Sequence, residues 1–309
     1  MDKKGVEVIF KKTILVLFLV LLVCGFVSAG LADFIKEFSN KITGRATSAT
    51  TSLNITVGNS APVVDSVTTI SSQSVTELGA TAVQFTFTAT DSDGVANLND
   101  ATAVANFQKS GETTRTNSSC VWLSDLDTDT ANYSCTVEIW YWDGSGAWDV
   151  NATIFDINNA FGENTTTQFT LQETTAMIMA PNSLAWTSLS PTSTDQKSTS
   201  NPIKVNNTAN KDITDGNLKV TAVNLGGEIT PSDYLLANAF SVNTADACEG
   251  TAMVNATATG ITGATIAAGN NTAGSGSEDI YFCLEAVTGG ISSQSYSTTS
   301  SGAWTVGVS

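Results

Sequence analysis

The sequence contains no histidine and few basic residues. Histidine is absent from all 309 positions, which excludes Ser-His-Asp and Cys-His nucleophile systems and every histidine-ligated metal centre. Lys and Arg number 13 against 29 Asp and Glu, for a net charge of -16. Such a surface repels phosphate backbones and anionic lipid, so we expect no nucleic-acid partner.

Residues 1–29 are predicted to be a secretory signal peptide. Four lysines precede an apolar run over residues 14–27, which is shorter than a membrane span, and small residues follow up to Ala29. An alternative is a pilin-type leader that is cleaved after Gly5 and leaves residues 6–42 as one assembly helix. Removing residues 1–29 takes away four Lys and two acidic residues, so 9 basic and 27 acidic residues remain, a net charge of -18.

Residues 30–61 are predicted to be an amphipathic helix followed by a tether. Leu31, Phe34, Ile35, Phe38 and Ile42 recur with the spacing of one helix face, which predicts a helix over residues 31–42. From residue 44 to residue 60, Thr, Ser, Ala and Gly dominate with little periodicity, as is typical of a tether.

The rest of the chain shows the alternation of half-buried strands, and no helical period there reaches a dozen residues. Alternating apolar and polar residues occur at 83–89, 137–141, 148–154, 169–171, 218–222, 280–284 and 304–308. We therefore predict an all-β protein with two tandem antiparallel Ig-like β-sandwiches, over residues 62–174 and 175–309. The stretch 145–150 recurs as 301–306 with one mismatch, which predicts a buried Trp, Trp148 and Trp304, at the start of a late strand in each.

Four cysteines remain after residue 29, and an even number in an exported chain predicts disulfides. Three pairings are open. Cys120 with Cys135 and Cys248 with Cys283 is favoured, because each pair then lies within one predicted domain. CxxC spacing is missing, which argues against zinc.

Most of the mature chain resembles the Ig-like modules of secreted archaeal cell-surface proteins. The resemblance is carried by residues 135–153 and 164–171 in the first half and by residues 181–191 and 201–210 in the second. It implies an extracellular, non-catalytic surface role with no defined ligand.

Two acidic loops are candidate calcium sites. In the first, Asp91, Asp93, Asn97 and Asp100 occupy ligand positions 3, 5, 9 and 12 of a calcium-loop template around Gly94, but position 1 is Ala89. In the second, Asp125, Asp127 and Asp129 alternate without the glycine and glutamate of an EF-hand. Calcium binding at either loop is a hypothesis. The alternative is that each loop is an ordinary turn that binds no metal.

Trp140, Trp142 and Glu138 are a candidate binding surface. If Cys135, Val137, Ile139 and Tyr141 face the core, these three side chains share the outer face and suit glycan stacking or a protein interface. A glycosidase needs two facing acids, and no second acid accompanies Glu138, so we expect no enzyme.

Eight Asn-x-Ser/Thr sequons are candidate glycosylation sites, a number close to the chance expectation. They are Asn54, Asn117, Asn132, Asn151, Asn164, Asn206, Asn255 and Asn270. The parity of residues 148–152 predicts that Asn151 points outward.

These features together predict a secreted or cell-surface, acidic, non-catalytic glycoprotein that acts in adhesion or in a surface layer or filament. Its partner is a surface protein, a glycan or another copy of itself. The alternatives are a carbohydrate-binding module that uses Trp140 and Trp142 and, below it, a pilin-like subunit. We expect no membrane anchor at the C-terminus, and the last strand could add to a neighbouring sheet.

Overall fold

The computed structural model describes residues 33, 36–37, 52–287 and 289–309. The predicted signal peptide, the pilin-type alternative and most of the predicted helix over residues 31–42 lie outside them. Two compact units divide the chain, Met1–Val57 and Gly58–Ser309. Within the described part of the second unit, the regular structure is antiparallel β apart from the 3₁₀ turns η1 (Val95–Asn97) and η2 (Ala237–Ala239), which confirms the all-β prediction.

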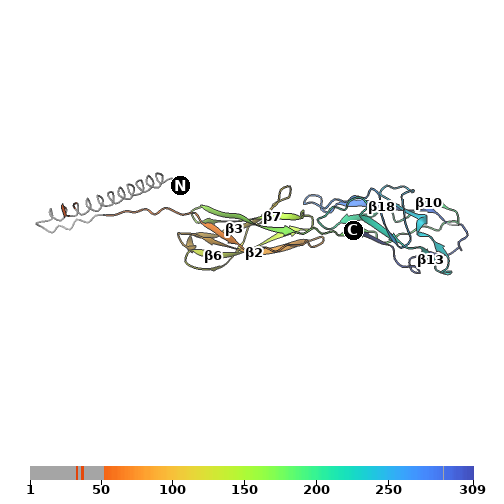
Figure 1. The fold of residues 1–309 in the computed structure, drawn as a ribbon, viewed down its shortest axis with the longest axis horizontal. Coiled ribbons are helices and arrows are strands. Elements are labelled where there is room, and N and C mark those ends of the chain that lie inside the picture. The colour runs from red at the N-terminus through yellow and green to blue at the C-terminus, as the bar shows by residue number, and fades with distance from the viewer. Residues whose placement is uncertain (1–32, 34–35, 38–51, 288) are drawn as a thin grey trace, which may run out of the picture. The chain divides into compact units, whose positions relative to one another are not determined.

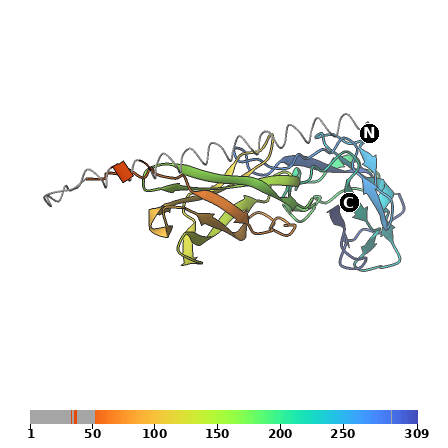
Figure 2. The ribbon, with the colours of Figure 1, turned by 60° about the vertical axis from the view of Figure 1, so that its left-hand side comes forward.

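Two four-stranded sheets form from residues 63–171, and we call them the first sheet pair. One sheet has the order β1-β2-β6-β5, and the other has the order β4-β3-β7-β8. Both can be followed in Figure 1 and in the turned view of Figure 2. Their bounds are β1 (Val63–Val67), β2 (Ala80–Thr90), β3 (Leu98–Gln108), β4 (Arg115–Asn117), β5 (Val121–Asp125), β6 (Thr130–Trp140), β7 (Gly146–Asp156) and β8 (Phe161–Leu171).

The core between these sheets is built by strand alternation. Val137, Ile139 and Tyr141 are buried, while Glu138 between them is exposed, as the period of two predicts. Phe87, Phe107, Tyr133 and Trp148 are among the largest fully buried side chains of this core, which is therefore closed.

Residues 177–308 build a second core between further sheets. One sheet has the order β16-β15-β18-β11-β9 with β10 also pairing with β18, and two three-stranded sheets have the orders β17-β12-β20 and β14-β13-β19. The bounds are β9 (Met177–Ala180), β10 (Thr194–Lys197), β11 (Ile203–Asn207), β12 (Leu218–Ala222), β13 (Leu225–Gly227), β14 (Tyr234–Leu235), β15 (Phe240–Asn243), β16 (Thr251–Ala252), β17 (Thr257–Gly260), β18 (Ser277–Ala286), β19 (Tyr296–Ser297) and β20 (Thr305–Val308).

The second core is closed around β18 and open at β9 and β20. Ile280, Phe282 and Leu284 of β18 are buried, whereas Met177 and Met179 of β9 and Val306 and Val308 of β20 are only half-buried. Each of these two strands is an edge strand, with β11 or β12 as its single partner among the described strands. Burial on this side of the core is therefore incomplete.

One detail of the sequence interpretation is wrong in this region. Trp304 was expected to be buried like Trp148, but it is half-buried and precedes β20. Its indole Nε1 donates to the carbonyl of Val223, while that of Trp148 donates to Gly144. A matching local sequence does not reproduce the covering elements that decide burial.

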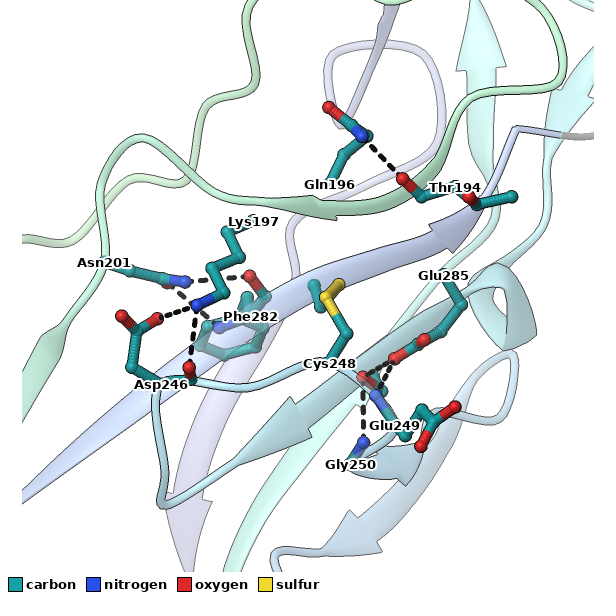
Figure 3. The surroundings of a disulfide bond; sticks show 12 residues. Thr194, Gln196, Lys197, Asn201, Asp246, Cys248, Glu249, Gly250, Phe282 and Glu285 are labelled. Atoms are coloured by element: carbon teal, nitrogen blue, oxygen red, sulfur yellow. Dashed lines mark hydrogen bonds and ion pairs between the residues drawn. A yellow bond between two sulfur atoms is a disulfide. The ribbon is translucent and has the colours of Figure 1, made fainter.

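Both disulfides form in the favoured pairing, Cys120–Cys135 and Cys248–Cys283. Figure 3 shows how the second bond and its neighbours fasten the loop around residue 246 to β18. Lys197 Nζ lies 3.0 Å from the Asp246 carboxylate, and Asn201 exchanges two hydrogen bonds with the backbone of Phe282. Two disulfides are typical of proteins from oxidising compartments. None of the described helical segments is long and apolar enough to span a membrane.

Candidate functional site

The first predicted calcium loop forms a compact turn at the end of β2. The side chain of Asp91 is fully buried. Its Oδ1 accepts a hydrogen bond of 2.9 Å from the backbone amide of Asp93, and its Oδ2 accepts one of 3.1 Å from Asn97 Nδ2. Gly94 has a φ of 98°, a conformation that glycine adopts without strain. Three of the four predicted ligands therefore lie in one turn, but among the described residues their carboxylates belong to no group of three whose oxygens all lie within 4.8 Å.

Two segments distant in sequence complete this polar cluster. Asp156, at the end of β7, is fully buried, and its Oδ2 accepts a 2.6 Å hydrogen bond from Asn59 Nδ2. Asn59 Oδ1 in turn accepts hydrogen bonds from Asn97 Nδ2 at 3.2 Å and from Asn158 Nδ2 at 2.6 Å. Nothing local in the sequence points to Asn59, which lies in the predicted tether, or to Asp156.

Hydrogen bonds lower the pKa of the Asp156 carboxyl group and so favour its charged form. Burial raises the pKa of its carboxyl group, but donors from Asn59, Ala160 and Asn158 outweigh burial and hold the pKa below its ordinary value of 3.8. The cluster thus offers charged carboxylate and amide oxygens, the ligand types that calcium prefers. The fourth predicted ligand, Asp100, bonds instead to the hydroxyl of Tyr133 at 2.7 Å. Calcium binding stays a prediction.

The second acidic loop is organised by its own turn. Asp127 Oδ1 accepts hydrogen bonds from the backbone amides of Asp129 and Thr130, and these bonds lower the pKa of its carboxyl group. Asp125 Oδ1 accepts a 3.0 Å hydrogen bond from Trp122 Nε1. Among the described residues, these three carboxylates do not form a group whose oxygens all lie within 4.8 Å.

One group of described residues does meet that distance, Cys248, Cys283 and Glu285. Both sulfurs belong to a disulfide, so they are not thiolate ligands. Glu285 Oε1 accepts a hydrogen bond from the hydroxyl of Ser241. It also accepts one of 2.8 Å from the amide of Glu249, which Figure 3 shows. The carboxylate therefore organises the loop beside the disulfide.

The predicted tryptophan surface is more covered than expected. Trp140 and Trp142 stack with ring centroids 5.0 Å apart, but both are half-buried rather than exposed. Trp142 also packs edge-on against Tyr141, and its Nε1 is buried without a hydrogen-bond partner among the described residues. Glu138 is exposed on the same strand face as Trp140. The two stacked rings thus cover part of each other's faces.

An exposed apolar strand was missed by the sequence interpretation. Every residue of β5 is exposed, including Val121, Trp122 and Leu123, and Leu126 in the following turn is exposed as well. We call Val121–Leu126 the β5 patch. Two of its six residues, Ser124 and Asp125, are polar or acidic and interrupt the apolar pattern. Beside it, the Cys120–Cys135 bond joins the start of the hairpin to β6.

The eight sequon asparagines differ in exposure. Asn54, Asn255 and Asn270 are exposed, and the other five are half-buried. Asn151 was expected to point into solvent, but it is half-buried and its Oδ1 is fully covered. On β7 it faces Asn106 of β3, so strand parity placed it outside the core but not in open solvent.

The open side of the second core contains a cavity of about 480 Å³. Met179 and Val306 line it from the two edge strands, and Trp186 and Trp304 line it from the connecting segments. All four side chains are half-buried, and none of the described residues that line the cavity is charged. The structure thus presents an apolar recess to solvent.

Comparison with known proteins adds no family assignment. No protein-family model matches the chain, and no curated protein matches it significantly.

Proposed function

We propose that this protein is an exported, non-catalytic component of the cell envelope, built of two tandem Ig-like β-sandwich modules, that acts in adhesion or in a surface layer or filament. The β5 patch is the observation that carries the proposal. An apolar, fully exposed edge strand is an aggregation hazard unless a partner covers it. A rigid, disulfide-bonded body that displays such a strand is suited to an interface.

Charge and chemistry support the same role. The net charge of -16 keeps separate molecules soluble, while the absence of histidine removes most catalytic devices. Two disulfides suit the conditions outside the cell.

The first test is location and assembly of the native protein. We expect the protein on intact cells to be accessible to added protease, and the purified protein to sediment as larger species at higher concentration. Leu123→Lys should weaken adhesion or assembly, whereas Thr170→Lys, at an exposed position of β8 in the other sheet, should not. A protein that stays inside the cell and remains monomeric at every concentration contradicts the proposal.

Carbohydrate binding is the second candidate, supported by the stacked pair Trp140 and Trp142 beside the exposed Glu138. A glycan array measured with the native protein and with Trp140→Ala tests it. Saturable binding that is lost in the variant supports this function, and no binding by either protein contradicts it.

Calcium binding would stabilise the fold of this protein and is compatible with either function. If the cluster of Asp91, Asp93 and Asn97 binds calcium, calcium should raise the unfolding temperature more than magnesium does, and Asp91→Asn should remove the difference. Equal shifts with both ions contradict the hypothesis.

A further inference from the structure

Residues 53–57 form an apolar segment without a partner. Leu53, Ile55 and Val57 are 82%, 71% and 83% exposed and alternate with Asn54 and Thr56. The segment has no strand pairing and no hydrogen bond within the described part of the chain. Strict alternation places the three apolar side chains on one face of an extended chain, which is the pattern of a strand with one buried face.

The open second core offers the matching surface. The edge strands β9 and β20 are each four residues long, close to the five of the segment. Beyond their pairing with β11 and β12, no backbone hydrogen bond among the described residues occupies the outer edge of either strand. The cavity between Met179 and Val306 is apolar and uncharged, and residues 53–57 carry no charge either.

Chain reach excludes insertion into the cavity of the same molecule. Asn59 is bonded to Asp156 at the end of the first sheet pair where β2 finishes. The other end of β2 lies next to the second core, where the amide of Leu78 bonds to the carbonyl of Thr208. The 11 residues of β2 span about 36 Å. Leu53 is six residues from Asn59 and reaches at most about 21 Å.

The core of the first sheet pair is a poor alternative site for the segment. Its inward-facing side chains, such as Phe87 and Phe107, are fully buried, so its core has no apolar space to fill. If residues 53–57 fill the cavity of the second core, they therefore come from another molecule.

We propose that residues 53–57 of one copy insert as a donor strand between β9 and β20 of a second copy. Leu53, Ile55 and Val57 fill the apolar cavity, and the donor backbone bonds to the open edge of β9 or β20. Donor and acceptor are different surfaces, so the contact is head-to-tail and extends into a filament unless it closes into a ring. This inference rests on the proposed function and names its partner as the protein itself.

Paired variants of the full chain test the proposal. Ile55→Lys disables the donor and Val306→Lys disables the acceptor, so each should sediment as a monomer. Thr56→Lys and Thr305→Lys place the same charge one residue away, on the opposite face, and should assemble like the native chain. An equimolar mixture of the two monomeric variants should form a dimer that does not grow. Native-like assembly of Ile55→Lys, or a mixture of folded variants that stays monomeric, overturns the proposal.

A peptide experiment keeps the test decisive if Val306→Lys fails to fold. A peptide of residues 51–58 should bind the Ile55→Lys chain saturably and change the fluorescence of Trp186 and Trp304. The same peptide with Lys at position 55 should bind about tenfold more weakly or worse. Equal binding of both peptides, or none, overturns the proposal. An apolar dye that binds the cavity without competition from the peptide identifies a small-molecule site instead.

The two proposals fail in different ways. If the protein lies at the cell surface and Ile55→Lys does not affect its assembly, the proposed function stands and the donor-strand proposal is wrong. If the peptide binds specifically but the protein never reaches the cell surface, the donor-strand proposal stands and the proposed function is wrong.

Discussion

At the scale of single residues, a buried ion pair stabilises the first sheet pair. The Asp143 side chain is fully buried, and its carboxylate accepts hydrogen bonds from Arg115 Nε at 3.1 and 2.9 Å and from the amide of Trp140 at 2.8 Å. Arg115 is itself largely covered. Removing one partner of such a pair leaves a buried charge without compensation.

Asp143→Leu should therefore lower the free energy of unfolding by about 3–5 kcal/mol. Lys204→Gln, which breaks an exposed pair with Asp279, should cost less than about 1 kcal/mol. Urea unfolding of both variants measures the difference. Similar losses of unfolding free energy in the two variants would show that water hydrates the Arg115 guanidinium once Asp143 is removed.

Asp156 should make stability depend on pH. Its folded-state pKa lies below the unfolded value, so its carboxylate stabilises the fold above the unfolded pKa, and this contribution is lost as the pH falls through the folded-state pKa. We expect native stability to fall below about pH 4 and Asp156→Asn to lose less over that window. Asn59→Ala, which removes one donor, should show an intermediate slope. Parallel curves for all three proteins contradict this assignment.

At the scale of strands and loops, the disulfides stabilise by restricting the unfolded chain. They close sequence separations of 15 and 35 residues. Replacing Cys120 and Cys135 together by alanine should cost about 3 kcal/mol, and replacing Cys248 and Cys283 should cost about 4 kcal/mol. Urea unfolding under oxidising conditions measures both, and the native protein under reducing conditions is the control. A larger loss for the shorter loop would mean that native contacts, not chain entropy, dominate.

The open edge of the second core should make methionine substitutions there less destabilising than those in its closed part. Met253 is fully buried, whereas Met179 on β9 is half-buried. Met253→Ala should cost about 2–5 kcal/mol, because it leaves a closed cavity, and Met179→Ala should cost less than half as much. Both substitutions should be made in the Ile55→Lys variant, in which no donor strand covers β9. Equal costs would show that the second core is closed without a partner.

At the scale of the whole molecule, charge opposes association. Copies that each carry a net charge of -16 repel one another at long range. Raising the salt concentration from about 0.01 M to 0.15 M shortens the Debye length from about 30 Å to about 8 Å, so assembly should increase. Sedimentation at constant protein concentration measures this. Assembly that weakens with salt would mean that attractive ion pairs hold the interface.

The sequence by itself determined the features that depend on neighbours along the chain. Strand alternation predicted the buried faces of β2, β6 and β7, because side chains of an extended chain alternate between two faces whatever lies beyond them. The cysteine pairing followed from proximity within each half of the chain. The turn around Gly94 was recognisable because Asp and Gly favour such turns for local backbone reasons.

Only the tertiary structure decided which surfaces are covered. Asn59 and Asp156 are 97 residues apart in sequence and meet because β1, which follows Asn59, begins at the end of the first sheet pair where β7 finishes. Trp148 and Trp304 lie in similar local sequences, yet only Trp148 lies in a closed core. The open edges of β9 and β20 are likewise invisible in the sequence. Burial depends on which distant strands pack over a residue, and a local pattern carries no information about those strands.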